Sequence, residues 1–171
     1  MRRRTQQLTL SAMFMALAIL FPMLFHAVGL GSTFLPMFWP LATAAFLLRP
    51  PLALSVAILA PILSSLMTGM PPISPPILHV MIIELILLSG TISLLYQRTG
   101  LGTIWILLIG LFMSRLALFF IVMVLAPILG LPGKIFSAGL IAQGLPGVIA
   151  MIVVVPVVVS RMKGEPLFAS R

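Results

Sequence analysis

Long apolar stretches alternate with short Gly/Pro-rich joints along the whole chain. A helix that spans a bilayer needs about 20 mostly apolar residues, and six stretches qualify, although the second is short. Glycine and proline in the joints end helices, because proline removes a backbone N–H and clashes with the preceding turn. The pattern predicts six transmembrane helices, over residues 8–28, 33–48, 51–68, 77–97, 102–126 and 135–160.

The composition excludes an ordinary water-soluble domain. Hydrophobic residues make up 61% of the 171 positions and charged residues only 7%, whereas a soluble domain carries about 25% charged residues to cover its surface. The solvent around this chain must therefore be largely lipid. The length suits one helical bundle, so we expect a single all-α membrane domain over residues 1–171.

Basic residues mark one side of the predicted bundle, because short cytoplasmic loops of membrane proteins accumulate Lys and Arg. With the N-terminus inside, six helices place eight of the ten basic residues on the cytoplasmic side: Arg2, Arg3, Arg4, Arg49, Arg98, Arg161, Lys163 and Arg171. Lys134 falls on the outer side of the membrane, and Arg115 falls within the fifth predicted helix. The distribution predicts an even number of helices with both termini in the cytoplasm.

The same charges do not indicate nucleic acid as a partner. The net charge is +8, but the basic residues are scattered between apolar runs and form no basic face. The start, Met1 followed by three arginines, resembles that of a signal peptide. It lacks a small-residue cleavage site, and more apolar runs follow, so we expect a retained first helix.

The predicted spans contain two charged residues, Glu84 and Arg115. Ionisable groups inside a bilayer are costly unless they are paired or hydrated, so they are functional candidates. From a rise of about 1.5 Å per residue, Glu84 lies about 10 Å below the outer end of its helix and Arg115 about 16 Å below. On the same measure Gln143 lies about 12 Å deep, and His79 is shallower.

Most polar side chains of the spans therefore lie in the outer half of the bundle. The inner halves of the third to sixth helices are mainly Leu, Ile, Val and Ala. A channel or proton relay needs polar groups along its whole path, so the one-sided pattern favours a binding cup above an apolar plug. Its predicted ligand-contacting residues are Trp39, Met70, His79, Glu84, Arg115 and Gln143.

Simpler roles stay open for these residues. Glu84 and Arg115 also fit a purely structural ion pair. His79 and Glu84 are five positions apart, about 140° around a helix, so they do not point at one metal ion. His26 and His79 also fit hydrogen-bonding groups at loop edges. We therefore expect no metal site.

Missing residue types exclude several chemistries. The chain has no cysteine, which excludes disulfides, thiol catalysis and thiolate metal sites. Aspartate is missing, and Glu84 and Glu165 are the two acidic residues, which excludes a Ser-His-Asp triad and paired-carboxylate chemistry. No GxxxxGK[ST] phosphate loop or HExxH zinc helix is present. We expect no enzyme, no cofactor and no ATP-binding site in this chain.

A seam of small residues lies on the first helix, where Ala12 and Ala16 are four positions apart. Small residues at this spacing let another helix approach closely in lipid. The partner of the seam is either a helix of the same bundle or a helix of another protein.

Three segments carry a resemblance to a known family. They are Leu8-Thr9-Leu10-Ser11-Ala12 with Ala16-Leu17-Ala18-Ile19; Gly29 to Phe34-Leu35-Pro36-Met37; and Pro61-Ile62-Leu63-Ser64-Ser65 with Thr68-Gly69-Met70-Pro71-Pro72 and Glu84. They resemble the substrate-binding S components of energy-coupling factor (ECF) vitamin transporters. The third segment is similar to the branch related to folate, pantothenate and riboflavin carriers, and the last two predicted helices match in hydropathy and length.

The resemblance implies a prokaryotic cell-membrane protein with six helices and both termini in the cytoplasm. Such S components capture a vitamin or related micronutrient in an outward-side pocket closed by outer loops. They associate with a transmembrane T component and two ATPases, which drive uptake. The AxxxA motif of the family, which contacts the T component, maps onto Ala12 and Ala16.

For the ligand, the resemblance and the polar residues together suggest a carboxylate-bearing vitamin such as pantothenate. Arg115 would pair with the carboxylate, Glu84 and Gln143 would hydrogen-bond polar atoms, and Trp39 would pack against the ligand. One departure is Ser89-Gly90, where related sequences often have an aromatic residue before the glycine.

Two other functions remain as alternatives. The first is a self-sufficient, ion-coupled secondary transporter of a small organic molecule, which the apolar inner half disfavours. The second is an intramembrane enzyme using His79, Glu84 and Arg115, which the missing nucleophile–base pair disfavours.

Overall fold

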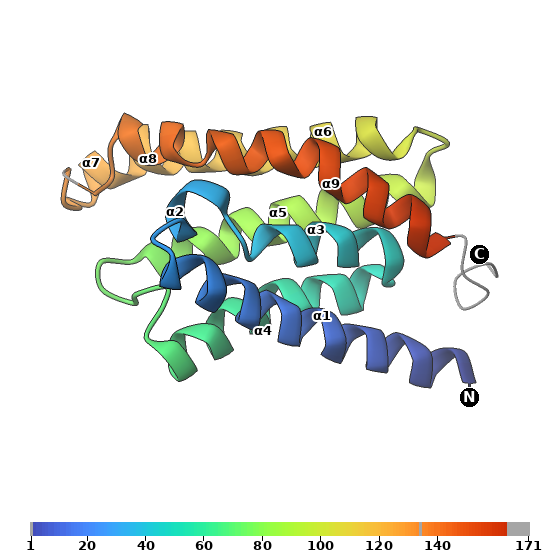
Figure 1. Cartoon of the computed structure of the whole chain (residues 1–171). Helices are drawn as coiled ribbons and strands as arrows, with labels where there is room; N and C mark the ends of the chain where they lie inside the picture. The colour runs from blue at the N-terminus through green and yellow to red at the C-terminus, as the bar shows by residue number, and fades with distance from the viewer. Residues whose placement is uncertain (1, 134, 164–171) are drawn as a thin grey trace.

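The computed structural model describes residues 2–133 and 135–163, and within these ranges the chain is helical and contains no strand. Figure 1 shows a bundle of helices that run roughly side by side. The elements are α1 (Arg2–Ala27), α2 (Gly31–Phe34), α3 (Phe38–Leu47), α4 (Pro50–Thr68), α5 (Ile77–Arg98), α6 (Thr103–Phe120), the π-helix η1 (Ile121–Leu125), α7 (Ala126–Ile128), α8 (Ala138–Gln143) and α9 (Leu145–Lys163).

The prediction of an all-helical fold is confirmed within the described residues. Among the described residues, five helical segments are long and apolar enough to cross a bilayer, and a sixth, Gly31–Leu47, is shorter. The five segments are Arg4–Ala27, Pro50–Thr68, Ile77–Arg98, Thr103–Ile128 and Ala138–Met162. The fold is therefore compatible with a protein that spans a membrane.

Three helices that the sequence pattern predicts as continuous are interrupted. Leu35 adopts a left-handed conformation with a φ of 49° between α2 and α3, and the proline that follows it disfavours helix at this position. The fifth helix continues as the π-helix η1 before a proline at the start of α7. The sixth begins only at Ala138 and breaks at Gly144, between α8 and α9.

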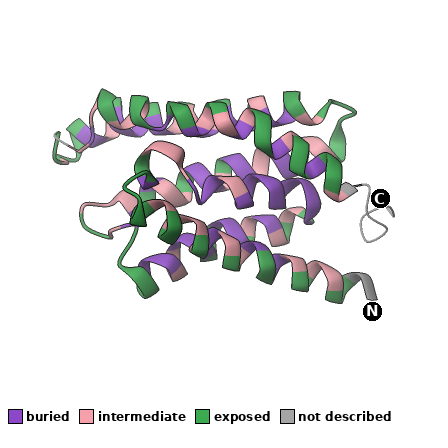
Figure 2. Ribbon diagram, in the orientation of Figure 1, coloured by how far each residue is buried: buried purple, intermediate pink, exposed green. Residues whose placement is uncertain are grey.

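The short helix α3 forms the centre of the bundle. It contacts α1, α4, α5 and α9, and nine of its ten residues are buried, with Trp39 as the exception. Figure 2 shows the buried residues of α3 surrounded by helices whose outer faces are exposed. Three alanines, Ala42, Ala44 and Ala45, are almost fully buried and let neighbouring backbones come close, as small residues do in lipid.

The two ends of the bundle differ in character. One end holds the start of α1, the α3–α4 and α5–α6 joints and the end of α9 (Figure 1), and we call it the arginine end, because Arg49, Arg98 and Arg161 lie near these points. The opposite end holds α2, the α4–α5 loop, α7 and α8. Lys134 and Arg171 lie outside the described residues. The membrane side that each end faces stays a prediction.

Candidate functional site

The two charged residues of the spans form an ion pair. Arg115 Nη2 on α6 lies 2.6 Å from Glu84 Oε1 on α5, and the side chains are 15% and 8% exposed. The hydroxyl of Ser114 donates to the same oxygen at 3.4 Å. The Phe38 ring of α3 lies 5.1 Å from Arg115 Cζ, a cation–π arrangement. Three helices therefore hold the two charges together, and the ion pair that the sequence analysis considered is present.

Two glycines allow close packing around α6, the helix that carries Arg115. A Cβ at Gly110 would come within 2.7 Å of Ile92 Cγ1, so α6 packs closely along α5 only because this position has no side chain. A Cβ at Gly144 would lie 3.2 Å from Arg115 Nη1, so the break between α8 and α9 borders the guanidinium. Close helix contact through small residues is the usual way in which helices pack in lipid.

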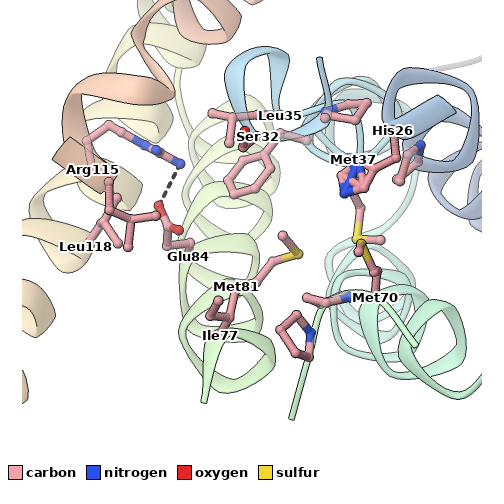
Figure 3. Close-up of a pocket in the computed structure, with 17 residues that line it drawn as sticks. His26, Ser32, Leu35, Met37, Met70, Ile77, Met81, Glu84, Arg115 and Leu118 are labelled. Carbon is pink, nitrogen blue, oxygen red and sulfur yellow. Dashed lines mark ion pairs between the residues drawn. The ribbon is translucent and has the colours of Figure 1, made fainter. Parts of the chain in front are cut away.

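The ion pair forms one wall of a cavity of about 240 Å³ at the α2 end of the bundle. The cavity is lined by residues of α1, α2, α3, α5, α6 and α8 and of the α4–α5 loop. Figure 3 shows Glu84 and Arg115 on one side and His26, Met37 and Met70 on the other. Small-molecule sites are mostly apolar hollows with a few placed polar groups, and this cavity has that composition.

Methionines form much of the apolar lining of the cavity. Met37, Met70 and Met81 line the cavity (Figure 3). Met37 is buried at 3% exposure, whereas Met70 is 51% exposed. Thioether side chains are flexible and polarisable, so they adapt to the shape of an apolar ligand group. This lining therefore suits an apolar body, and the ion pair suits a charged head.

His26, which the sequence places only at a loop edge, lines the cavity. Its imidazole lies directly against the backbone of Gly31, and a Cβ at that glycine would collide with the ring at Nδ1. Sequence reasoning missed this role for His26. The available signal was the Gly29–Gly31 joint that follows it, because a glycine often marks a close approach to the backbone.

Trp39 and Gln143 do not line the cavity; they hold the α2 segment beside it. The indole of Trp39 donates to the Phe34 carbonyl at 2.8 Å. The centroid of the Phe25 ring lies 5.9 Å from that of the Phe34 ring and 6.2 Å from that of the Trp39 ring. Gln143 Nε2 donates to Ser32 Oγ at 2.7 Å. Gln143 therefore contacts the lining residue Ser32 from outside the cavity, and Trp39 contacts Phe34 of the same helix α2, whereas both residues were predicted to contact the ligand.

The α4–α5 loop is fixed by two hydroxyls at the end of α4. Ser64 Oγ donates to the Met70 carbonyl and Ser65 Oγ to the Pro71 carbonyl, each at 2.8 Å. Gly69 ends α4 in a left-handed conformation with a φ of 73°, as glycine does at many helix C-termini. These contacts position Met70 on the cavity, where the sequence analysis expected it.

His79 does not join the site. It is exposed on α5 and is not among the cavity-lining residues. Its position five residues before Glu84 rotates it away from the ion pair, as the helical geometry requires. Among residues 2–133 and 135–163, no group of three or more His, Asp or Glu side chains could hold a metal ion.

The seam on α1 faces away from the bundle. Ala12 and Ala16 are exposed, whereas the buried face of α1 carries Ser11, Phe14 and Ala18. The Gln7 side chain ties this helix to the arginine end through hydrogen bonds that it makes with the backbone of the α3–α4 joint. Packing inside the bundle is therefore not the role of the seam in this chain.

No family model matches the chain, and comparisons with curated proteins and with solved structures likewise give no match. The geometry alone defines the class: a helical bundle, suited to a membrane, with a small cavity at one end. The cavity combines a buried ion pair with an apolar, methionine-rich wall.

Proposed function

We propose that this protein is the substrate-binding S component of an ECF-type importer. It would capture a vitamin or related micronutrient from outside the cell for ATP-driven uptake by a T component and two ATPases. The observation that carries the proposal is the cavity with its buried Glu84–Arg115 pair, which lies at the end of the bundle opposite the arginine end. By the positive-inside rule, the arginine end would face the cytoplasm and the cavity the outside.

The cavity supports a small ligand with a charged group. Its volume of about 240 Å³ lies below the range of about 300–1,000 Å³ that is usual for drug-sized ligands. Arg115 would bind a carboxylate, because a guanidinium offers donors in a fork that matches two carboxylate oxygens. Pantothenate or another carboxylate-bearing vitamin is the first class to test.

The exposed Ala12–Ala16 seam supports the proposal that a T component binds this chain. Ala12 and Ala16 leave a shallow strip on the outer face of α1, and in lipid such strips let a second helix come close enough for extensive van der Waals contact. The T component would dock there. This docking would supply the coupling to ATP, since the chain carries no phosphate-binding loop of its own.

Co-purification tests the function most directly. The tagged full chain, extracted in mild detergent from its native membrane, is expected to bring down one membrane protein and two ATPases in fixed proportion. Mass spectrometry of the same preparation would identify small molecules retained in the cavity. Isolation of the chain alone, together with ion-gradient-driven uptake by vesicles containing only this chain, would refute the S-component assignment.

The second candidate is a self-sufficient, ion-coupled secondary transporter, and one observation favours it. Ser89 and Ser93 on α5 are 1% and 0% exposed, and among the described residues their hydroxyls have no hydrogen-bond partner. They lie between Glu84 and the arginine end, within the half expected to be an apolar plug. Unpaired hydroxyls inside a bilayer are costly, so an ion path through this half has a physical basis.

A further inference from the structure

The formal charges of Glu84 and Arg115 cancel one another across 2.6 Å, so the ion pair adds no net charge to the cavity. This balance restricts the ligand. A monoanion placed on Arg115 would leave two negative groups around one positive group in a poorly hydrated site. Buried charges without compensation are strongly unfavourable, whereas paired ones are tolerated. A ligand that brings a positive and a negative group together preserves the balance.

The pair also has hydrogen-bonding capacity that the described side chains do not use. Among the described residues, Arg115 Nε and Nη2 are buried without a hydrogen-bond partner, although Nη2 lies within ion-pair distance of Glu84. A guanidinium has five N–H donors, and buried donors without acceptors are costly. The two contacts to Glu84 both end on Oε1, so Oε2 is the oxygen that a ligand donor would reach.

The closeness of the two charges sets the spacing of the ligand's charged groups. Arg115 and Glu84 present their charges side by side on adjacent helices. In an α-amino acid one carbon atom separates the ammonium from the carboxylate, so its charges are also adjacent. An amino acid with a long flexible chain between its two charges would have to fold back on itself to reach both partners, at a cost in conformational entropy. The geometry therefore fits an α-ammonium carboxylate head.

The apolar lining of the cavity indicates what kind of side chain the ligand carries. Met37 and Met70 lie across the cavity from the pair, whereas Met81 and Ile77 lie on α5 with Glu84, and Leu118 lies beside Arg115 on α6 (Figure 3). Apolar, adaptable walls accept aliphatic, thioether or aromatic groups. A charged side chain on the ligand would find no partner there apart from His26 and Ser32.

We infer that the cavity binds a small zwitterion, an α-amino acid or a compound with the same head group, with an apolar side chain. Its carboxylate would bind Arg115, its ammonium would bind Glu84, and its side chain would lie among the methionines. This inference rests on the proposed function only in taking the cavity as the ligand site. It narrows the substrate class from carboxylate-bearing compounds in general to those that also carry a cation.

Calorimetric titration of the full chain in nanodiscs tests the inference with matched probes. The zwitterions are L-leucine, L-methionine and L-phenylalanine. Each is compared with its N-acetyl derivative, which keeps the carboxylate alone, and with its amide, which keeps the ammonium alone. At least one zwitterion is expected to bind at least about tenfold more tightly than both of its derivatives, because each derivative leaves one buried charge unpaired.

Two results would overturn the inference: no binding by any of the three zwitterions, or an N-acetyl derivative that binds as tightly as its parent. Pantothenate, a monoanion, is included as a comparison. If pantothenate binds tightly and the zwitterions do not, the zwitterion inference fails while the S-component proposal survives. If the zwitterions bind, no T component or ATPase co-purifies and vesicles containing only this chain show ion-driven uptake, the inference survives and the proposed function fails.

Charge-removing variants provide an independent readout. In Glu84→Gln the site becomes cationic, so preference is expected to invert in favour of the N-acetyl acid. In Arg115→Gln the site becomes anionic, and preference is expected to invert in favour of the amide. Arg98→Gln, the same substitution at the arginine end, should leave the order of affinities unchanged. A purely structural ion pair would weaken all probes equally, and that result would also overturn the inference.

Discussion

Gln143 Nε2 donates a hydrogen bond to Ser32 Oγ at 2.7 Å and so joins α8 to α2 across 111 positions of the chain. Ser32 lines the cavity, whereas Gln143 does not. The contact lies at the exposed surface, beside the indole–carbonyl bond between Trp39 and Phe34. It therefore ties two segments that border the cavity without touching what the cavity would contain.

Removing this contact is expected to speed ligand release. In Gln143→Ala the α2 segment loses one bond to α8, and a neutral hydrogen bond contributes about 0.5–1.5 kcal/mol. The dissociation rate should rise by no more than about tenfold, with a smaller effect on association. Stopped-flow fluorescence of Trp39, in a Trp105→Phe background, would measure both rates. The control is Gln97→Ala at the arginine end; an unchanged dissociation rate in Gln143→Ala would show that the contact does not restrain α2.

Arg115→Ala is expected to weaken ligand binding by at least about tenfold, since a buried charge-assisted contact that loses one partner costs several kcal/mol. Titration of the retained ligand in nanodiscs gives the affinity. Thermal unfolding gives the accompanying loss of stability, because Glu84 stays buried without its partner. Arg98→Ala removes an exposed arginine and should change neither value. Unaltered affinity in Arg115→Ala would remove this residue from the site.

Gly31→Ala is expected to displace His26, because the added Cβ would occupy the position of the imidazole. Overpacking of this kind costs about 1–3 kcal/mol, so both stability and ligand affinity should fall. The measurement is a double-mutant cycle with His26→Ala, whose smaller side chain removes the collision and should restore stability. Gly100→Ala, at a position with open space around it, is the control. Additive effects in the cycle would contradict the predicted collision.

Ala12→Leu combined with Ala16→Leu is expected to abolish co-purification of the T component while leaving ligand affinity unchanged. Both positions are exposed and lie away from the cavity, and larger side chains keep a second helix at a distance. Quantitative mass spectrometry of the purified complex would measure the partner, and calorimetry would measure the ligand. Ala142→Leu, at an exposed position on α8, is the matched control. Retention of the T component in the double variant would exclude this seam as its contact.

Much of the fold follows from local signals in the chain. The predicted helices 51–68 and 77–97 agree closely with α4 (Pro50–Thr68) and α5 (Ile77–Arg98). Arg49-Pro50-Pro51 begins α4, Gly69 ends it, and Thr99 follows the end of α5. Each of these signals lies next to the helix end that it marks. The break between α2 and α3 was not predictable in the same way. A Cβ at Gly147 would collide with the Phe34 backbone, so a helix more than 100 positions away packs against this break.

The sequence by itself determined that this chain is a helical bundle suited to lipid, because its apolar stretches are long enough to span a bilayer as helices, and a helix satisfies its own backbone hydrogen bonds without water. It also placed Glu84 and Arg115 in the same outer half of the predicted bundle, since the rise per residue sets an approximate depth. Only the tertiary structure decided which side chains face the cavity. Rotation about each helix axis depends on contacts with distant helices, and these turned His26 inward, His79 outward, and Gln143 toward Ser32.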